Sequence, residues 1–424
     1  LDAKKAEDAF SAGRRHEIAG QFDAALQQFS EAIGYVPDFA AAYRHRGKAH
    51  LQLGHTAEAL SDLNAAIRIQ NDDAEAFHLR ADLLLSQDEF EKAIADYDRA
   101  LALKRERPEV FAGRASAYRA LRQYRRALDD YTQAIRLRPN QAVYYKERAL
   151  VQAKLSSEAD AIEDLTRALQ QDSSYTDALI ERGFLYGQIN DFVKAIADFD
   201  RALAIDPKIA RAYGLRAEAW RHRGEPQTAI ADYTKAIALD ANNVELYLAR
   251  ASTYIGMKQF ELALQDRERA VALRPDYAEA YVARGGSYHL LGQHEKGLAD
   301  RSEAIRLKPG MPEAWHARGS AYYLLGEYER AAEDLQEAVR LNPNYAEARE
   351  VLAHARRKIE EKRAASQRLP EAEAPSPAPV AEPAPEPSAP TPAIADPKPG
   401  PEPAPAPQPP AEEKPVLDPK LAEN

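Results

Sequence analysis

Cysteine is absent from this chain of 424 residues, which excludes disulfides, thiolate metal sites and cysteine nucleophiles. The ten histidines form no H-E-x-x-H pattern, and no P-loop, G-x-G-x-x-G or G-x-S-x-G motif occurs. No apolar run approaches the roughly 18 residues that a membrane span requires. We therefore expect a soluble, non-catalytic protein without a membrane span, a metal site or a cofactor.

Strong charge of one sign is also missing from most of the sequence. The formal net charge is −10, and residues 370–424 contribute ten acidic and three basic side chains, or −7, which leaves −3 for residues 1–369. A nucleic-acid interface requires a clustered basic face. The sequence therefore predicts no nucleic-acid partner.

The sequence starts at Leu1, and no long apolar segment precedes its first amphipathic pattern. We expect either that a leader has been removed or that a larger polypeptide continues upstream. The compartment stays open between the cytoplasm and, after removal of a leader, the bacterial periplasm. The sequence sets no oligomeric state.

Residues 176–209 show the pattern on which the protein is built. Apolar or small residues recur there in steps of three and four, first from Leu179 to Tyr186 and then from Phe192 to Ile205. This spacing predicts two amphipathic helices. Asn190-Asp191 lies between them and is expected to end one helix and cap the next. One unit is therefore a helical hairpin.

The hairpin pattern occurs ten times at a spacing of 34 residues, without an insertion. A small residue stands at position 20 of every repeat, from Ala25 to Ala331, and alanine stands at position 27, from Ala32 to Ala338. A single hairpin cannot bury its apolar stripe, so neighbours must stack on it. The sequence thus predicts one all-α solenoid of stacked hairpins.

This pattern resembles that of the tetratricopeptide repeat family, which has characteristic residues at positions 4, 8, 11, 20, 24, 27 and 32. In the tenth repeat these positions are filled by Trp315, Gly319, Tyr322, Ala331, Leu335, Ala338 and Pro343. The resemblance implies an α-α superhelix and a scaffold that holds a protein or peptide partner on its concave face.

The period divides the sequence into a lead-in, ten repeats, a capping helix and a tail. The tail, residues 370–424, contains 19 prolines and almost no large apolar residues, so we expect it to be disordered. Residues 346–369 continue the first-helix pattern and predict a C-terminal capping helix. After the lead-in at 1–5, the repeats are 6–39, 40–73, 74–107, 108–141, 142–175, 176–209, 210–243, 244–277, 278–311 and 312–345.

Position 7 is arginine and position 23 is aspartate in repeats 2 to 10. In a hairpin that turns near position 15, these two positions lie level with each other, which predicts a repeated internal ion pair. The alternative is a ladder of arginines that binds an anionic ligand. The predicted pairs are Arg46 with Asp62, Arg80 with Asp96, Arg114 with Asp130, Arg148 with Asp164, Arg182 with Asp198, Arg216 with Asp232, Arg250 with Asp266, Arg284 with Asp300, and Arg318 with Asp334.

Positions 2, 5, 9, 12 and 13 of the first helices lie off the packed stripe and, by the resemblance, line the concave face. In repeats 8 to 10 they are mostly apolar or small with acidic edges, which suits an extended segment with apolar and basic side chains. The alternative is that they only pack neighbouring helices together. The candidate partner-binding residues are Leu248, Ser252, Ile255, Val282, Gly286, Leu290, His316, Ser320 and Tyr323, with Glu245, Glu279 and Glu313 at the edge.

The function that the sequence favours is a protein-protein interaction scaffold. Two alternatives stay open: the regulatory or targeting part of a longer enzyme, and an envelope assembly factor in bacteria. Some relatives clamp a C-terminal carboxylate with lysine at position 5 and asparagine at position 9, but repeats 1, 2 and 5 lack this combination.

Overall fold

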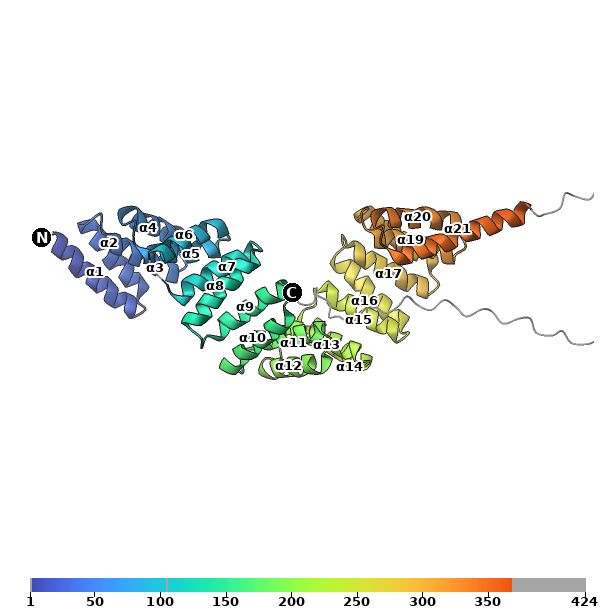
Figure 1. The fold of residues 1–424 in the computed structure, drawn as a ribbon, viewed down its shortest axis with the longest axis horizontal. Coiled ribbons are helices and arrows are strands. Elements are labelled where there is room, and N and C mark those ends of the chain that lie inside the picture. Colours follow the sequence, from blue (N-terminus) through green and yellow to red (C-terminus); the bar gives the residue numbers. More distant parts are fainter. Residues whose placement is uncertain (1, 104–105, 368–424) are drawn as a thin grey trace, which may run out of the picture. The chain divides into compact units, whose positions relative to one another are not determined.

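The computed structural model describes residues 2–103 and 106–367, and these residues form twenty-one α-helices and no strand (Figure 1). The described residues are arranged in two compact units, which divide inside one helix, between Ala219 and Trp220. The uniform repeat gives no sign of this division in the sequence. The expected disordered tail from residue 370 onward lies outside the described residues.

The first unit is a series of antiparallel helical hairpins. Its helices are α1 (Asp2–Ile18), α2 (Phe22–Tyr35), α3 (Ala40–Gln52), α4 (Thr56–Ile69), α5 (Ala74–Ser86), α6 (Phe90–Ala102), α7 (Pro108–Ala120), α8 (Tyr124–Leu137), α9 (Ala142–Lys154), α10 (Glu158–Gln171), α11 (Thr176–Gln188), α12 (Phe192–Ile205) and most of α13 (Ala210–His222).

The second unit begins in the last residues of α13 and repeats the same hairpin. Its further helices are α14 (Pro226–Leu239), α15 (Val244–Gly256), α16 (Phe260–Leu273), α17 (Ala278–Leu290), α18 (His294–Leu307), α19 (Pro312–Leu324), α20 (Tyr328–Leu341) and α21 (Ala346–Gln367). The prolines of α14 and α19 stand in the first helical turn, where a missing N–H costs little.

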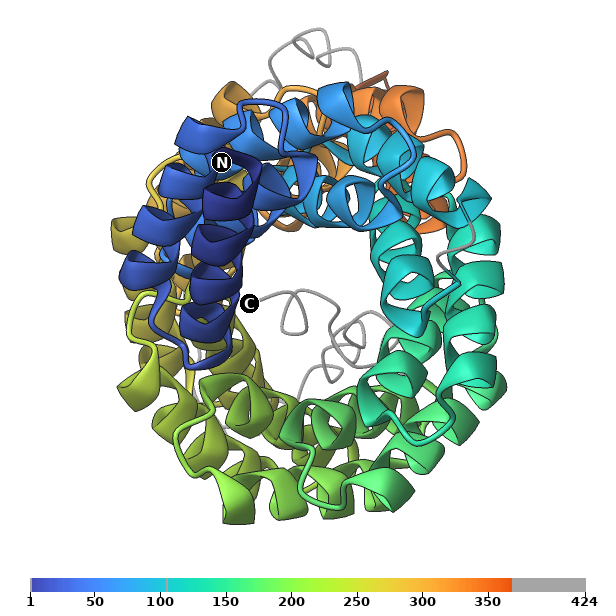
Figure 2. The ribbon, with the colours of Figure 1, turned by 90° about the vertical axis from the view of Figure 1, so that its left-hand side faces the viewer.

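Successive hairpins of the first unit lie side by side, as Figure 2 shows from blue to green. The first helix of a hairpin contacts its own second helix and also the first helix of the next hairpin, as α3 contacts α4 and α5. The same holds for α17, α18 and α19 in the second unit. The first helices pack against one another from α1 to α7 and from α17 to α21, and together they make up the first-helix layer of each unit.

Each hairpin turns at position 15, where the backbone adopts a positive φ. A residue in this left-handed region ends a helix by satisfying its last carbonyl groups. Five of the ten turns use glycine, such as Gly224, and Asn190 adopts φ 64°. Asp191 then caps α12, because its side chain accepts a hydrogen bond from the backbone N–H of Lys194. The turn predicted at Asn190-Asp191 is therefore confirmed.

Position 24 of the second helix supplies the centre of most hairpins. Phe199 at this position is fully buried against Gly183 at position 8, where an added Cβ would lie 2.8 Å from the ring. The small residue at position 8 is thus required by the large one opposite it. Position 24 is also fully buried as Phe29, Leu63, Tyr97, Tyr131, Leu165, Tyr233 and Leu335.

The two ends of the array differ slightly from the sequence-based boundaries. α1 begins at Asp2, so most of the expected lead-in is helical; Ala3 and the two lysines that follow favour a helix, and Asp2 suits its first turn. α21 ends at Gln367 and packs Leu352 against Leu335 of α20, which buries the open end of the last hairpin.

Candidate functional site

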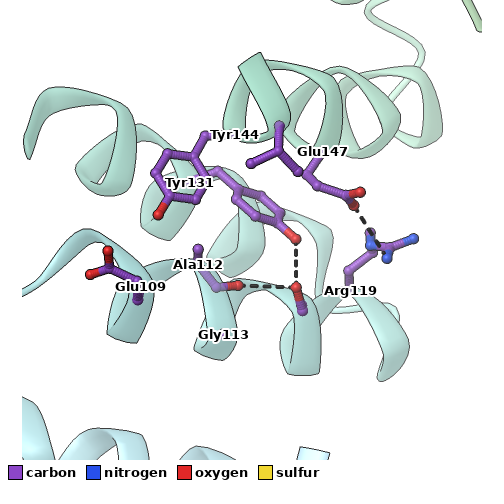
Figure 3. A pocket seen from close by; sticks show the side chains of 9 residues that line it. Glu109, Ala112, Gly113, Arg119, Tyr131, Tyr144 and Glu147 are labelled. Carbon is purple, nitrogen blue, oxygen red and sulfur yellow. Dashed lines mark hydrogen bonds and ion pairs between the residues drawn. The ribbon is translucent and has the colours of Figure 1, made fainter. Parts of the chain in front are cut away.

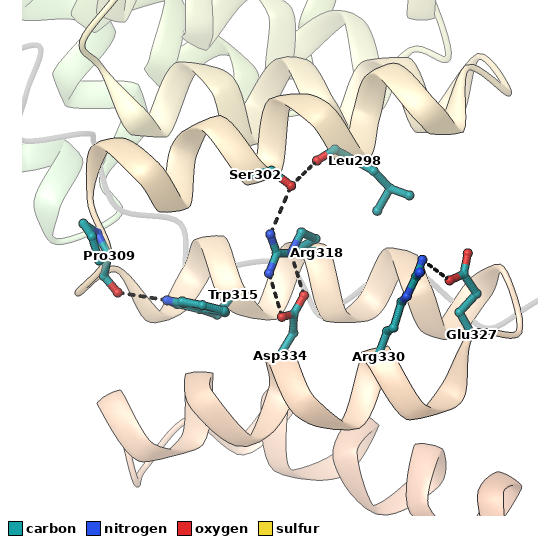
Figure 4. Close-up of polar contacts among 8 residues, drawn as sticks. All are labelled: Leu298, Ser302, Pro309, Trp315, Arg318, Glu327, Arg330 and Asp334. Atoms are coloured by element: carbon teal, nitrogen blue, oxygen red, sulfur yellow. Dashed lines mark hydrogen bonds and ion pairs between the residues drawn. The ribbon is translucent and has the colours of Figure 1, made fainter.

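The predicted Arg–Asp pairs meet in a bidentate geometry. In the last hairpin, Arg318 Nε lies 2.7 Å from Asp334 Oδ2 and Nη2 lies 2.8 Å from Oδ1 (Figure 4). Asp334 is only 6% exposed. The same two hydrogen bonds join Arg46 to Asp62, Arg80 to Asp96, Arg114 to Asp130, Arg148 to Asp164, Arg182 to Asp198, Arg250 to Asp266, and Arg284 to Asp300.

Most of these arginines also reach back to the preceding hairpin, a contact that the sequence did not predict. Arg318 Nη1 donates to Ser302 Oγ at 3.0 Å, and Ser302 stands at position 25 of the previous repeat. The acceptor varies between repeats but is polar each time. The other contacts join Arg46 to Ser30, Arg80 to Asn64, Arg114 to Asp98, Arg148 to Thr132, Arg182 to Thr166, Arg216 to Asp200, and Arg250 to Thr234.

The arginines at position 7 therefore have their hydrogen-bonding edges occupied within the protein. The hydrogen bonds that Arg182 donates to Asp198 outweigh burial and raise the pKa of Arg182, so this guanidinium stays charged across the accessible pH range. A bidentate carboxylate on each guanidinium leaves little for a ligand. This geometry supports a structural role for the pairs and argues against a ligand-binding arginine ladder.

The candidate residues of repeats 8 to 10 do not all lie in an open groove. Leu248 and Val282 are partly buried and pack against the core clusters of their hairpins. Leu290 is 49% exposed and Ser252 is exposed, with its hydroxyl bound to the carbonyl of Leu248. Gly286, Ile255, His316, Ser320 and Tyr323 are half-buried.

Two of the three acidic edge residues are neutralised inside their own repeats. Arg274 donates to Glu245 at 2.9 Å, and Lys308 lies 2.9 Å from Glu279. Both cations stand at position 31, close to the start of the first helix. Glu313 is exposed. A preference for basic partner side chains therefore has little support from Glu245 and Glu279, because their charge is already compensated.

A hollow on the same helix layer lies in the first unit, between α7 and α9 (Figure 3). Its volume is about 350 Å³. The residues that line it from α7 stand at positions 2, 5, 6, 9 and 12 of repeat 4. The lining residues are Glu109, Ala112, Gly113, Ser116, Arg119, Tyr131, Val143, Tyr144 and Glu147.

Small side chains on α7 create this hollow. Only glycine fits at position 113, because a Cβ there would lie 2.3 Å from the Tyr97 hydroxyl of the preceding hairpin. Ala112 and Ser116 on either side are also short, so the face recedes here. Sequence reasoning missed the site because it searched for apolar residues, whereas the signal was a run of small residues at groove positions.

The floor of the hollow is polar. Tyr131 is almost completely buried, and its hydroxyl lies 2.9 Å from Ser116 Oγ (Figure 3). Burial raises the pKa of Tyr131, so its hydroxyl stays protonated. One wall carries Arg119, 3.3 Å from Glu147, and Lys146 also lies 2.7 Å from this carboxylate. The hollow can thus offer hydroxyl and ionic contacts beside tyrosine rings.

A metal site requires several ligating side chains close together, and a membrane span requires a long apolar helix. Within 2–103 and 106–367, no group of three or more His, Asp or Glu side chains could hold a metal ion. Two histidine pairs occur, His50 with His55 and His289 with His294, and each pair stands across a hairpin turn. None of the helices in the described part of the protein is long and apolar enough to cross a membrane.

A stack of two-helix units whose first helices lie in one layer defines a helical-repeat protein. The sequence pattern of the tetratricopeptide repeat family matches residues 10–74, 48–109, 112–176, 181–244 and 248–312, and a second pattern of this description matches residues 312–345. The protein belongs to the tetratricopeptide repeat family. Members of this family are generally non-catalytic scaffolds for protein interaction.

Several solved structures are similar to this protein over part or most of its length. A tetratricopeptide repeat protein from Parabacteroides merdae is 18% identical, with a TM-score of 0.49 over 58% of this chain and 98% of that chain. Yeast Tom70 is 13% identical, with a TM-score of 0.44 over 86% of this chain and 97% of that chain. YrrB, described as having an unusual peptide-binding site, is 24% identical, with a TM-score of 0.38 over 46% and 99%. No curated protein matches the sequence.

Proposed function

We propose that this protein is a non-catalytic scaffold that binds an extended segment of a protein partner along its first-helix layer. The observation that carries the proposal is the hollow on α7 and α9, because it lies at the groove positions of repeat 4. A site of this size accepts one or two side chains of a bound segment.

The chemistry of the hollow favours a segment with mixed side chains. Tyr131 and Tyr144 line the hollow, although each is at most 7% exposed. Ser116 Oγ is a polar group on its floor that donates to the carbonyl oxygen of Ala112 and lies 2.9 Å from the Tyr131 hydroxyl. Aromatic surfaces with a few polar groups are typical of places that anchor a peptide. The exposed Leu290 and Leu324 of the second unit offer further apolar contacts on the first helices.

The proposal is tested by filling the hollow. The full-length protein is used to purify partners from cells, and each identified partner is then titrated against purified protein. Ala112→Phe should weaken binding by roughly tenfold or more, because the ring occupies the space of a partner side chain. The matched control is Asp129→Phe, which adds the same ring at an exposed position of α8. Equal affinity of both variants with retained helicity would reject the hollow as a binding site.

A further inference from the structure

Two arginines of the second unit have guanidinium nitrogens that are shielded from solvent and, among the residues that the structure describes, lack the carboxylate partner that the position-7 arginines have. Arg267 and Arg301 stand at position 24, where eight other repeats place a buried aromatic ring or leucine. Arg301 is only 8% exposed, and its Nε and Nη1 atoms are shielded from solvent without a hydrogen-bond partner. Arg267 Nε is also shielded from solvent and has no hydrogen-bond partner in the described part of the protein. A buried guanidinium without a counter-charge is costly.

Comparison of the two repeats explains why Arg301 is the less satisfied of the pair. Arg267 Nη1 donates to the carbonyl oxygen of Ala283 and to Ser287 Oγ, both at 2.8 Å, in the following repeat. The residue equivalent to Ser287 for Arg301 is Ala321, which has no hydroxyl group. The neighbouring Ser320 Oγ is itself buried and unpaired.

Within residues 2–103 and 106–367, no carboxylate forms an ion pair with Arg301, and Asp300 raises its pKa only through space. Its neighbour Asp300 receives Arg284 on both oxygens, at 2.8 and 2.7 Å. Burial lowers the pKa of His289 and His316, and the Arg301 charge lowers both further, which places the guanidinium near these two rings. Burial also lowers the pKa of Arg301, to about 10, so it remains a cation at neutral pH while the histidines are neutral.

Other repeats show what normally meets the tip of a position-24 side chain. In repeat 3, the Tyr97 hydroxyl donates to the carboxylate of Asp82 at 2.6 Å. In repeat 4, the Tyr131 hydroxyl meets Ser116 Oγ. Both partners stand at position 9 of the same repeat, which is a groove position. For Arg301, position 9 is Gly286, which has no side chain to offer.

Gly286 also adjoins the other buried arginine. A Cβ placed on Gly286 would lie 3.7 Å from Arg267 Nη1 and would meet no other atom within 4 Å. We propose that the space at Gly286, which adjoins Arg267 and stands at the position that meets the tip of the position-24 side chain in repeats 3 and 4, is a carboxylate-binding subsite for Arg267 and Arg301 that holds the acidic group of a protein segment. The subsite deepens the proposed function, since it lies on the first-helix layer and rests on a bound segment. The subsite uses arginines at position 24, whereas the relatives that clamp a C-terminal carboxylate use lysine at position 5 and asparagine at position 9.

The carboxylate can belong to an Asp or Glu side chain or to the C-terminus of a polypeptide, since both offer two oxygens to a guanidinium. The surroundings of Gly286 distinguish the subsite from the arginines at position 7, which are already bound to aspartate. A ligand carboxylate here replaces the missing position-9 acceptor. It also supplies the counter-charge that the two buried guanidinium groups lack.

The first experiment uses acetate as the probe and needs no partner. Because a ligand that binds only the folded state raises its stability, sodium acetate should raise the melting temperature of the full-length protein above that in sodium chloride of equal ionic strength. Arg301→Leu should lose this acetate-specific rise. The control Arg306→Leu, on the exposed side of the same helix, should keep it. A rise that persists in Arg301→Leu, or none in the native protein, overturns the subsite.

Arg301→Leu could lose the acetate effect simply because it folds poorly, so a second variant tests the subsite by adding a carboxylate. Gly286→Asp places a carboxylate of the protein itself beside Arg267, at the position from which Asp82 accepts the hydrogen bond of the position-24 residue Tyr97. It should raise the melting temperature and abolish the response to acetate, whereas Gly286→Asn should do neither. A Gly286→Asp protein that keeps the native response to acetate contradicts the assignment.

Labelled peptides then separate the two sources of carboxylate. One peptide carries a central glutamate and an amidated end, a second carries glutamine and a free C-terminus, and a third carries glutamine and an amidated end. The native protein should bind one of the first two roughly tenfold more tightly than the third, and Arg301→Leu should not. Equal binding of all three rejects the subsite. Ala112→Phe tests the groove separately, so loss of the preference with partner binding intact leaves the proposed function standing.

Discussion

Arg182 donates two hydrogen bonds to Asp198, from Nε and Nη2 at 2.8 Å each, and a third to Thr166 of the preceding hairpin at 3.0 Å. The aspartate is 4% exposed, and the arginine side chain is 13% exposed. One guanidinium therefore joins the two helices of its own hairpin and holds the neighbouring hairpin as well.

Removing one member of this pair should cost more than removing both. Arg182→Leu leaves the buried carboxylate of Asp198 without a counter-charge, which should lower the free energy of unfolding by roughly 3 to 5 kcal/mol. The double variant Arg182→Leu with Asp198→Leu should be close to the native value. Urea denaturation of all four proteins measures the coupling, and the exposed pair Arg306 with Glu303 serves as a control with little effect. Additive changes at Arg182 and Asp198 would contradict the pairing.

Substitution of Gly297 by alanine should destabilise the protein, although nine repeats have alanine at this position. An added Cβ would lie 2.7 Å from the backbone carbonyl oxygen of Gly285, which cannot move without shifting a helix. Strain of this kind costs about 1–3 kcal/mol. The control is Gly256→Ala, where the Cβ meets nothing within 4 Å and a gain of about 0.4–1 kcal/mol is expected. Thermal melts should show opposite signs for the two variants; equal signs would refute the close approach.

Acid should weaken the N-terminal end of the first unit through Glu17. Burial alone would raise the pKa of this carboxyl group, but hydrogen bonds with His45 and Lys48, at 2.7 and 2.8 Å, outweigh it and lower the pKa from 4.5 to about 2. Its stabilisation is complete above the unfolded pKa of 4.5 and is lost as pH falls through the folded value of about 2.

Hydrogen exchange over α1 to α3 measures this effect as pH falls. In the native protein, protection of these helices should fall across the interval between the two pKa values. Glu17→Gln should start with lower protection and lose less of it, because its side chain does not titrate. If both proteins respond to acid in parallel, another group controls the acid stability of this end.

The partly buried groove residues should behave differently from the exposed ones. Val282→Glu and Leu248→Glu place a charge against a core cluster and should lower the free energy of unfolding by at least about 1–3 kcal/mol. Leu290→Glu, at a side chain that is 49% exposed, should leave stability nearly unchanged and weaken partner binding. Denaturation and partner titration are measured together. A stable Val282→Glu protein would show that this residue faces the groove after all.

The sequence alone predicts the hairpins well, because helix period, turn residues and small-to-large packing are all local signals. The alignment of Arg182 with Asp198 follows from counting residues on either side of a turn. The contact from Arg182 to Thr166 did not, because it depends on the register between hairpins and its acceptor changes from repeat to repeat.

The hollow near Ser116 and the unpaired Arg301 were missed for a related reason. The hollow forms because Gly113 has no side chain to fill the space beside it. Arg301 stays unpaired because Gly286 has no side chain that could accept a hydrogen bond. A repeat pattern describes what each position usually holds. It does not show how departures in two adjacent repeats combine in space.

Most position-7 arginines donate a hydrogen bond to position 25 of the preceding repeat, so these contacts between hairpins all run in the same direction along the chain. Repeat 1 lacks this arginine, because its position 7 is Ala12. Because serine, asparagine, aspartate and threonine all serve as acceptors at position 25, an arginine accepts whichever hairpin stands before it. Duplication or loss of a whole hairpin would therefore preserve the joint on both sides. During evolution, the number of repeats can therefore change while the contacts between neighbouring hairpins stay the same.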